Sequence, residues 1–440
     1  MFIRYTPCLL LWGALAATAA PVTFHKDVVP ILQKHCQTCH RPGEAAPMAF
    51  LTYKETRPWA KAIREAVMSG KMPPWTAERG VGRKFHNDRT MPEADKRVLH
   101  AWAEAGAPEG NANDAPPPVT FTEGWIMGKP DKTWQLPEAY TVPASGTIEY
   151  TYYIIPNAFP QDTWITAAEI RPGARQVVHH VIAYGRPPGS VWLKDEQAER
   201  FFVPASRVAG QQAPANVKPS EWRQRIVGYA PGVRPRAAVN GGARLIPAGS
   251  DLVFELHYTA AGKAMPDRST LGIMLAKEPP KKRLVTQAAV NFGLRIPPGA
   301  DNHRVDATVT LAQPVTLLSV TPHMHLRGKA FEYRAVYPSG ETEVLVRVPK
   351  YDFNWQISYE FDQPLALPKG TRIECVAHYD NSANNKFNPD PAKEVRWGDQ
   401  SWEEMMVGFM ELSLDLDQDI DSLFERRKAP PAAAVTAEAR

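Results

Sequence analysis

Proline is the residue type that most restricts how this chain can fold. The sequence has 42 prolines among 440 residues, about twice the usual share of roughly 5%. Proline lacks a backbone donor and damages helix interiors, whereas turns, linkers and edge strands accept it. The sequence therefore predicts a chain made mostly of β-strands and loops. Its length predicts about two to four domains.

The N-terminal part of the chain has a different pattern. Residues 21–108 show helical periodicity, for example in the i, i+4 spacing of Ile63 and Val67. A polar stretch rich in proline, glycine and asparagine follows, and we assign residues 109–120 as a linker. The sequence thus predicts a small all-α domain joined to a larger β part.

From about residue 121 the pattern changes to short β runs separated by proline and glycine turns. Examples are VVHHVIAY at 177–184 and RIECVAHY at 372–379. Many short strands with turn signals predict β-sandwich or jelly-roll domains. Because this part is long for one sandwich, we divide it into two all-β domains, at residues 121–285 and 286–420.

The two ends of the chain carry other signals. Residues 1–20 combine Arg4 with a short apolar run and the A-x-A sequence Ala17-Thr18-Ala19, which is typical of an export signal. The apolar run is shorter than the roughly 20 residues of a membrane span. We therefore expect a periplasmic or secreted protein with no membrane span after signal removal. Residues 421–440 predict a disordered tail.

The charge balance adds one exclusion. The net charge is +4, from 51 basic and 47 acidic residues, and no long basic run occurs. This distribution gives no electrostatic footprint for nucleic-acid binding.

The sequence Cys36-Gln37-Thr38-Cys39-His40 is a C-x-x-C-H motif. Two thiols at this spacing reach both vinyl groups of one haem, and the adjacent imidazole ligates the iron. A zinc site needs a second cysteine pair, but only Cys375 remains beyond the signal. A thioredoxin-like redox pair is the other alternative. We predict one covalent haem c, bound by Cys36, Cys39 and His40.

The sixth ligand of the iron is predicted to be Met72. It lies in the rigid sequence Lys71-Met72-Pro73-Pro74-Trp75, and this part of the chain resembles a class I cytochrome c, in which a methionine before proline commonly fills that position. Met48 lies only eight residues after His40, too close to wrap around a haem. A histidine ligand or a vacant sixth position stays open as an alternative.

Five histidines beyond residue 120 form suggestive groups: His179-His180, His257 and His323-Met324-His325. His323 and His325 at i, i+2 share one face of a strand and can chelate one ion. His179 and His180 are adjacent, so they bind one metal only if the strand has a bulge or they use different ring nitrogens. Together, the histidines predict a metal-binding region.

The order His-His, His-Tyr, His-x-His and Glu-Met resembles that of the copper type II, ascorbate-dependent monooxygenases. This family includes peptidylglycine hydroxylating monooxygenase and dopamine β-monooxygenase, and the resemblance covers roughly residues 120–415. It implies two jelly-roll domains that hold one copper ion each. The implied ligands are His179, His180 and His257 at one site and His323, His325 and Met405 at the other.

Three departures from the family limit what the resemblance implies. Thr321 stands where peptide-amidating members have a substrate-binding arginine, and Val407 replaces a polar residue. Cys375 is the single cysteine of this part, so the family's disulfides are absent. Peptidylglycine is therefore not the expected substrate. The choice of Met405 over Met406 depends on the Glu-Met match alone.

The resemblance implies an oxidoreductase, a copper-dependent monooxygenase that hydroxylates an aliphatic C–H bond of a small-molecule substrate with O2. It assigns O2 activation to the His323, His325 and Met405 site, and electron supply to the other. A periplasmic electron donor is expected, with the attached cytochrome c as a relay. Two alternatives stay open: a non-catalytic electron-transfer or copper-binding protein, and a haem-centred catalyst such as a peroxidase.

Overall fold

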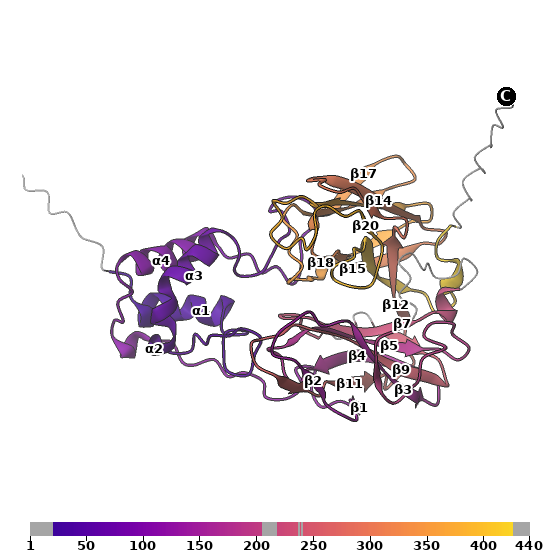
Figure 1. Ribbon diagram of the computed structural model, residues 1–440, viewed down its shortest axis with the longest axis horizontal. Coiled ribbons are helices and arrows are strands. Elements are labelled where there is room, and N and C mark those ends of the chain that lie inside the picture. The colour runs from indigo at the N-terminus through magenta and orange to yellow at the C-terminus, as the bar shows by residue number, and fades with distance from the viewer. Residues whose placement is uncertain (1–20, 205–217, 236–237, 239–240, 426–440) are drawn as a thin grey trace, which may run out of the picture.

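The computed structural model describes residues 21–204, 218–235, 238 and 241–425. It is a mainly β protein of several sheets with a β-sandwich-like fold and a few N-terminal helices (Figure 1). The β-rich character expected from the proline content is confirmed. The predicted signal at 1–20 lies outside the described residues. None of the described helices is long and apolar enough to cross a membrane.

The N-terminal helices gather at one end of the molecule (Figure 1). This helical region comprises residues 24–114, apart from the segment around Trp75 and Phe85, which packs on the second β region. Phe24, Leu32 and Trp102 are fully buried in its core, and Ile63 and Val67 face the same core as their spacing predicts. The helices are η1 (Phe24–Val28, a π-helix), α1 (Val29–His35), α2 (Tyr53–Thr56), η2 (Arg57–Trp59), α3 (Ala60–Met68), α4 (Glu93–Glu104) and η3 (Ala112–Asp114).

The first β region, residues 132–275, consists mainly of two sheets. A five-stranded sheet has the order β6-β3-β9-β5-β7, and β1-β11-β4-β8 form a second layer. Phe254 and Leu256 from one layer and Ile165, Ile170 and Leu271 from the other share one buried core. The strands are β1 (Lys132–Gln135), β2 (Tyr140–Val142), β3 (Thr151–Phe159), β4 (Thr163–Arg171), β5 (Val178–Arg186), β6 (Phe201–Phe202), β7 (Gln224–Tyr229), β8 (Gly242–Ile246), β9 (Ser250–Tyr258), β10 (Met265–Asp267) and β11 (Thr270–Leu275), with the 3-10 helix η4 at Pro219–Glu221.

The second β region, residues 282–425, repeats this layered plan. Strands β12-β21-β15-β18 form one layer and β14-β19-β16-β17 the other. Val320, Tyr333, Tyr379 and Met410 are buried between them. The strands are β12 (Lys282–Val290), β13 (Arg295–Ile296), β14 (His303–Thr310), β15 (Val315–His323), β16 (Gly328–Val336), β17 (Thr342–Val348), β18 (Tyr359–Leu367), β19 (Arg372–Tyr379), β20 (Val395–Arg396) and β21 (Val407–Leu414), with the 3-10 helix η5 at Ile420–Ser422.

One continuous sheet joins the two β regions. Strands β8 and β12 pair in parallel, with Lys282 opposite Gly242 and Arg283 opposite Ala243. The eight-stranded sheet β1-β11-β4-β8-β12-β21-β15-β18 therefore belongs to both regions. The predicted boundary between residues 285 and 286 is wrong, because it cuts through β12. The turn before Lys282 separates the two regions.

The predicted tail also begins too early. Ile420 and Leu423 are buried in the core of the second β region, and Phe424 pairs with Leu311 in an isolated bridge. Residues 421–425 therefore belong to this region, because their apolar side chains fill its core. The remainder of the predicted tail, residues 426–440, lies outside the described residues.

Part of the predicted domain at 21–108 packs on the second β region instead of the helices. Trp75 and Phe85 contact its core, and Phe85 forms a bridge with Phe361. The backbone N–H of Glu78 donates to the carbonyl of Arg347 at 2.8 Å. Such pairing satisfies edge groups of a sheet from a distant segment, so the local sequence carries no signal for it.

The predicted linker at 109–120 is held against the helices along part of its length. The backbone N–H of His25 donates to the carbonyl of Glu109 at 3.1 Å. The side chain of Gln33 donates to the carbonyl of Pro117 at 2.9 Å. These contacts fix much of the linker to the helical region.

Candidate metal centre

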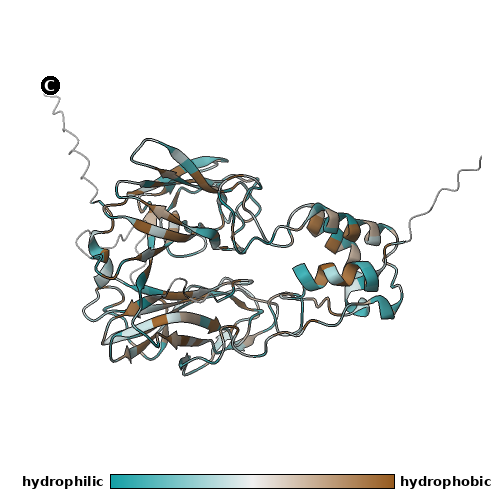
Figure 2. Ribbon diagram, turned by 180° about the vertical axis from the view of Figure 1, so that it is seen from behind, coloured by the Kyte–Doolittle hydropathy of each residue, from teal (hydrophilic) through white to brown (hydrophobic). Residues whose placement is uncertain are grey.

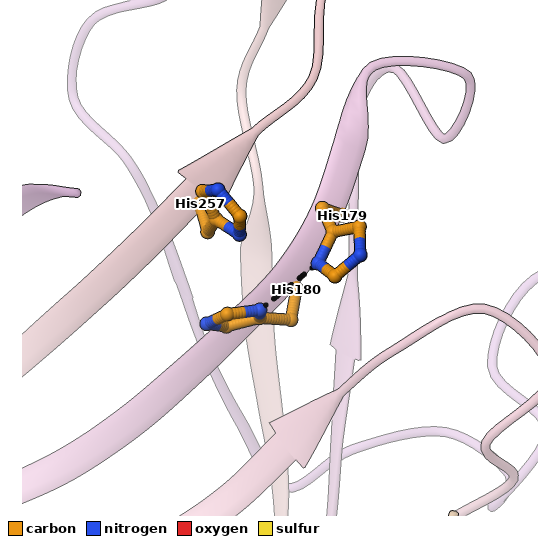
Figure 3. Close-up of side chains that lie close together, drawn as sticks. All are labelled: His179, His180 and His257. Carbon is orange, nitrogen blue, oxygen red and sulfur yellow. Dashed lines mark hydrogen bonds between the residues drawn. The ribbon is translucent and has the colours of Figure 1, made fainter. Parts of the chain in front are cut away.

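Three histidines of the first β region form a compact cluster. Strands β5 and β9 pair so that His180 lies opposite His257, and a register shift before His180 leaves His179 as an extra residue. This register shift is the bulge that two adjacent histidines need in order to bind one metal, and it turns His179 toward His180. One ring nitrogen from each residue lies within 4.8 Å of the other two. Figure 3 shows the three rings turned toward one another.

The cluster is suited to metal binding by its protonation state. Burial lowers the pKa of His179 to about 4. Burial also holds the pKa of His180 and His257 well below the usual range for histidine, and the other histidines lower it further. All three rings are therefore neutral near pH 7, as a metal ligand must be. His179 Nε2 and His257 Nδ1 are buried without a hydrogen-bond partner among the described residues.

His323 and His325 form a second set at the end of β15. His323 is the last residue of the strand, and the two rings lie 5.2 Å apart at 90°. Nδ1 of His323 lies 2.8 Å from Oε1 of Gln356, and Nδ1 of His325 lies 3.3 Å from the carbonyl of Glu403. A metal-binding histidine commonly donates its other N–H in this way. Nε2 of His325 is buried without a partner among the described residues.

Burial has the same effect on this second set. It lowers the pKa of His323 to about 4, against the opposing hydrogen bond to Gln356. It holds the pKa of His325 well below the usual range, with His323 as the next contributor. Both rings are neutral near pH 7, with Nε2 as the available ligand atom.

The structure separates the two candidate methionines. Met406 is completely buried in the core of the second β region, whereas Met405 is partly exposed. The carboxylate of Glu404 accepts hydrogen bonds from the backbone N–H of both His325 (2.8 Å) and Met405 (3.3 Å). Burial raises the pKa of Glu404 to about 7. Glu404 thereby links the backbones of Met405 and His325, and Met405 is the more exposed of the two methionines.

The two histidine sets lie on either side of a single layer of aromatic rings. The ring of Phe353 lies 4.9 Å from that of His179 and 5.9 Å from that of His325. Tyr150 stacks on His257 at 4.3 Å and lies 6.5 Å from His325. Although each set comes from its own β region, both sets contact the same two aromatic rings, and His180, His257 and His325 are buried.

Sequence reasoning missed the residues that surround the histidines. Gln356, Phe353 and Tyr150 lie in no motif and reach the site only through tertiary packing. Ser401 also contacts the first set, with Oγ 3.3 Å from Nε2 of His257. Glu404 belonged to the Glu-Met match, but its hydrogen bonds to the backbone carry no sequence signal.

The C-x-x-C-H segment follows α1 in the helical region. Cys36 and Cys39 are free thiols at intermediate exposure. Burial raises the pKa of Cys36 to about 12 and that of Cys39 above its usual value. A thioredoxin-like pair needs a lowered thiol pKa, so these thiols do not fit that alternative.

His40 has the surroundings of an iron ligand. Its ring stacks on Phe50 at 4.3 Å, and its Nδ1 lies 3.3 Å from the carbonyl of Met48. This contact fixes the ring and leaves Nε2 for a metal. Burial lowers the pKa of His40, which favours the neutral ligand form.

Met72 is not joined to His40 by any hydrogen bond or ring contact within the described ranges. It lies in the loop after α3, where its backbone N–H donates to the carbonyl of Ala66 at 3.0 Å. His25 and His35, the nearby alternatives, contact the carboxylates of Glu109 and Asp95. Met72 therefore stays a prediction.

The C-x-x-C-H segment is docked on the first β region. Arg234 donates to Oγ1 of Thr38 at 3.1 Å, and Arg175 forms an ion pair with Glu44 at 2.7 Å. Arg89 also donates to the carbonyl of Gly232. The motif thus lies against residues that follow β7, the strand paired with β5.

Comparisons with known proteins add little to this description. No protein-family model and no curated protein matches the chain. Similar solved structures include the infectious bursal disease virus Gx strain, at 10% identity over 68% of this chain and 77% of that one, with a TM-score of 0.19. Another is PNGF-II, at 8% identity over 63% and 59%, with a TM-score of 0.23. Similarity this low carries no argument about function. Fold and site define a β-sandwich-like protein in which five histidines, three of them buried, converge from two β regions.

Proposed function

We propose that this protein is an exported, haem- and copper-containing monooxygenase that hydroxylates an aliphatic C–H bond with O2. The observation that carries the proposal is the convergence of five histidines from two β regions, three of them buried and two half-buried, with pKa values held low by desolvation. In this proposal, a cytochrome c domain is followed by two jelly-roll domains of the copper type II monooxygenase kind. Its location would be periplasmic or secreted.

The donor set favours copper over other metals. His179, His180 and His257 offer three imidazoles, and His323 and His325 offer two. The thioether of Met405 completes the second donor set in this proposal. Thioether with imidazole suits Cu(I), whereas zinc and magnesium gain little from methionine. The buried, unpartnered ring nitrogens of three of these histidines fit a bound ion, because buried polar atoms normally have partners.

Copper, when bound, would supply the redox chemistry that activates O2. The protein's own residues orient the ligands and keep water away. Gln356 and the Glu403 carbonyl fix the rings of His323 and His325. Phe353 and Tyr150 fill the space between the two sets. A dry site strengthens electrostatic interactions and prevents side reactions.

A haem at Cys36, Cys39 and His40 would connect the site with an outside electron donor. The contacts of Arg234, Arg175 and Arg89 hold this segment on the first β region. This docking also suits the second candidate function, an electron-transfer protein that binds copper without turnover. Substrate-dependent O2 uptake distinguishes the two candidates, because only the monooxygenase consumes O2 when substrate is added.

Metal analysis with EPR of the oxidised protein tests the proposal. We expect about one haem and about two type 2 copper ions per chain. His323→Ala should reduce the copper content to about one and abolish oxygenation. His378→Ala is the matched control, because His378 lies in β19 outside the cluster. A protein that takes up zinc in both sites with no preference for copper would contradict the proposal.

A further inference from the structure

A cavity of about 230 Å³ lies between the two β regions. Its walls include β4 and β7 of the first region and β15 and β21 of the second. For comparison, an apolar cavity of about 150 Å³ is known to hold benzene. The cavity is therefore large enough for a small organic molecule. We call it the Arg225 cavity, after an arginine that lines it.

Arg225 is a partly buried cation that lines the cavity and has no anionic partner among the described residues. Its guanidinium forms no hydrogen bond or ion pair with any residue in the described part of the chain, and burial lowers its pKa. The other cavity arginines are engaged: Arg244 pairs with Glu411, Arg175 with Glu44, and Arg234 bonds to Thr38. Burial of an unpaired charge is costly, so the position favours a bound anion.

The backbone has features that make room for this guanidinium. A register shift between β5 and β7 falls beside Arg225, as in a β-bulge that redirects a side chain. A Cβ on Gly228 would overlap the guanidinium of Arg225. The guanidinium lies 5.4 Å from the ring centroid of Phe409. A cation–π contact of this kind offsets only a small part of the free-energy cost of removing water from the guanidinium.

The cavity adjoins the second histidine set. The ring of Phe409, which lines the cavity beside Arg225, lies 6.1 Å from the ring of His323. Thr321 also lines the cavity and lies two residues before His323 on the same face of β15. The charge of Arg225 contributes to the lowered pKa of His323. A molecule held by Arg225 would lie close to His323.

Two acidic side chains that line the cavity, Glu411 and Glu169, have other partners. Glu411 is engaged by Arg244 and by the hydroxyl of Thr286. Glu169 accepts a hydrogen bond from the backbone N–H of Met127, and burial raises its pKa. The charge of Glu411 opposes the effect of burial on the pKa of Arg225, but the two side chains form no hydrogen bond or ion pair.

We propose that the Arg225 cavity binds a small organic carboxylate, with Arg225 as the residue that recognises the anion. A planar guanidinium matches a carboxylate in a bidentate arrangement. If the proposed function holds, this carboxylate is the substrate, an aliphatic acid whose chain extends past Phe409 toward His323. Only this assignment as substrate rests on the proposed function.

Calorimetry of ligand binding to the metal-free protein tests the proposal. The probes are butyrate, its neutral isostere butyramide, and inorganic phosphate. Butyrate should bind the wild type at least about tenfold more tightly than butyramide, which lacks the charge of the bidentate contact, and than phosphate, which keeps a charged contact but lacks the aliphatic chain. Arg225→Met should remove this preference, and Arg225→Lys should weaken it. Equal binding of butyrate and butyramide, or a preference for phosphate, would overturn the proposal.

The matched control is Arg171→Met. Arg171 lies 5.3 Å from the ring centroid of Trp125, much as Arg225 lies over Phe409, but it does not line the cavity. It should keep the butyrate preference, and loss of that preference in both variants would overturn the proposal. Arg225→Met should also keep or raise the thermal stability of the metal-free protein, since it removes an unpaired, partly buried charge. A clear drop would assign Arg225 a structural role instead.

These experiments stand apart from the test for copper. If the cavity binds butyrate through Arg225 but the protein binds no copper, the carboxylate site stands and the proposed function fails. If copper binds and butyrate does not, the proposed function stands and this inference fails.

Discussion

Met405 and Met406 are neighbours in the chain, and we expect their replacement to have opposite effects. Met406 is 0% exposed in the core of the second β region, whereas Met405 is partly exposed beside His325. Truncation of a buried methionine to alanine costs about 2–5 kcal/mol, from lost burial and the cavity that remains. Because Met406 is completely enclosed, Met406→Ala should cost about 3 kcal/mol. Met405→Ala should cost roughly 1 kcal/mol or less.

Thermal unfolding of the metal-free protein measures this difference. A loss of about 3 kcal/mol corresponds to a fall in Tm of about 6–12 °C for a domain of this size. Copper binding is compared in Met405→Leu and Met406→Leu, since leucine keeps the volume of methionine but lacks the thioether. We expect Met405→Leu to weaken Cu(I) binding and Met406→Leu to leave it unchanged.

Two results would contradict the assignment of Met405 as the ligand and Met406 as a core residue. If Met405→Ala destabilises the metal-free protein as much as Met406→Ala, then Met405 is a packing residue. If Met406→Leu, and not Met405→Leu, weakens Cu(I) binding, then the ligand assignment is wrong and the core must rearrange around the metal.

Three further predictions address the haem and the remaining ligands. Met72→Ala should remove the weak near-infrared band of methionine-ligated ferric haem; its absence in the wild type, or its survival in the variant, would exclude Met72. In the copper-loaded protein, the Cu(II) centres should oxidise the reduced haem in a first-order step that is independent of protein concentration in stopped-flow mixing. That step should be lost in a His179→Ala/His257→Ala double variant. Dependence of the rate on protein concentration would exclude an intramolecular relay. Gln356→Leu should lower copper affinity by about 10–100-fold in chelator competition, because the ring of His323 loses its orienting contact; an unchanged affinity would show that Gln356 has no such role.

The sequence predicted the β-rich character and the histidine groups well. Both depend on local information: proline excludes helices, and short apolar runs between turns indicate strands. His323 and His325 were expected on one face of a strand, but β15 ends at His323; the two rings nevertheless lie 5.2 Å apart. The adjacency of His179 and His180 required a bulge, and the pairing of β5 with β9 contains it.

Boundaries between regions were predicted poorly. The sheet that joins β8 to β12 through Lys282 and Arg283 brings together segments that no local pattern connects. The same applies to Phe85, which is close to the predicted haem ligands in sequence but pairs with Phe361 in the second β region. Long-range strand pairing depends on edges and exposed backbone groups, and these exist only after the sheets have formed.

The candidate ligands can be read from the sequence: a C-x-x-C-H segment, five grouped histidines and two adjacent methionines. Their combination depends on tertiary packing. It buried Met406 and left Met405 accessible, and it brought both histidine sets against Phe353. It also left Arg225 unpaired in a cavity near His323. The physical reason is that ligand type is a local property, whereas burial, separation and charge pairing arise from packing between elements far apart in the chain.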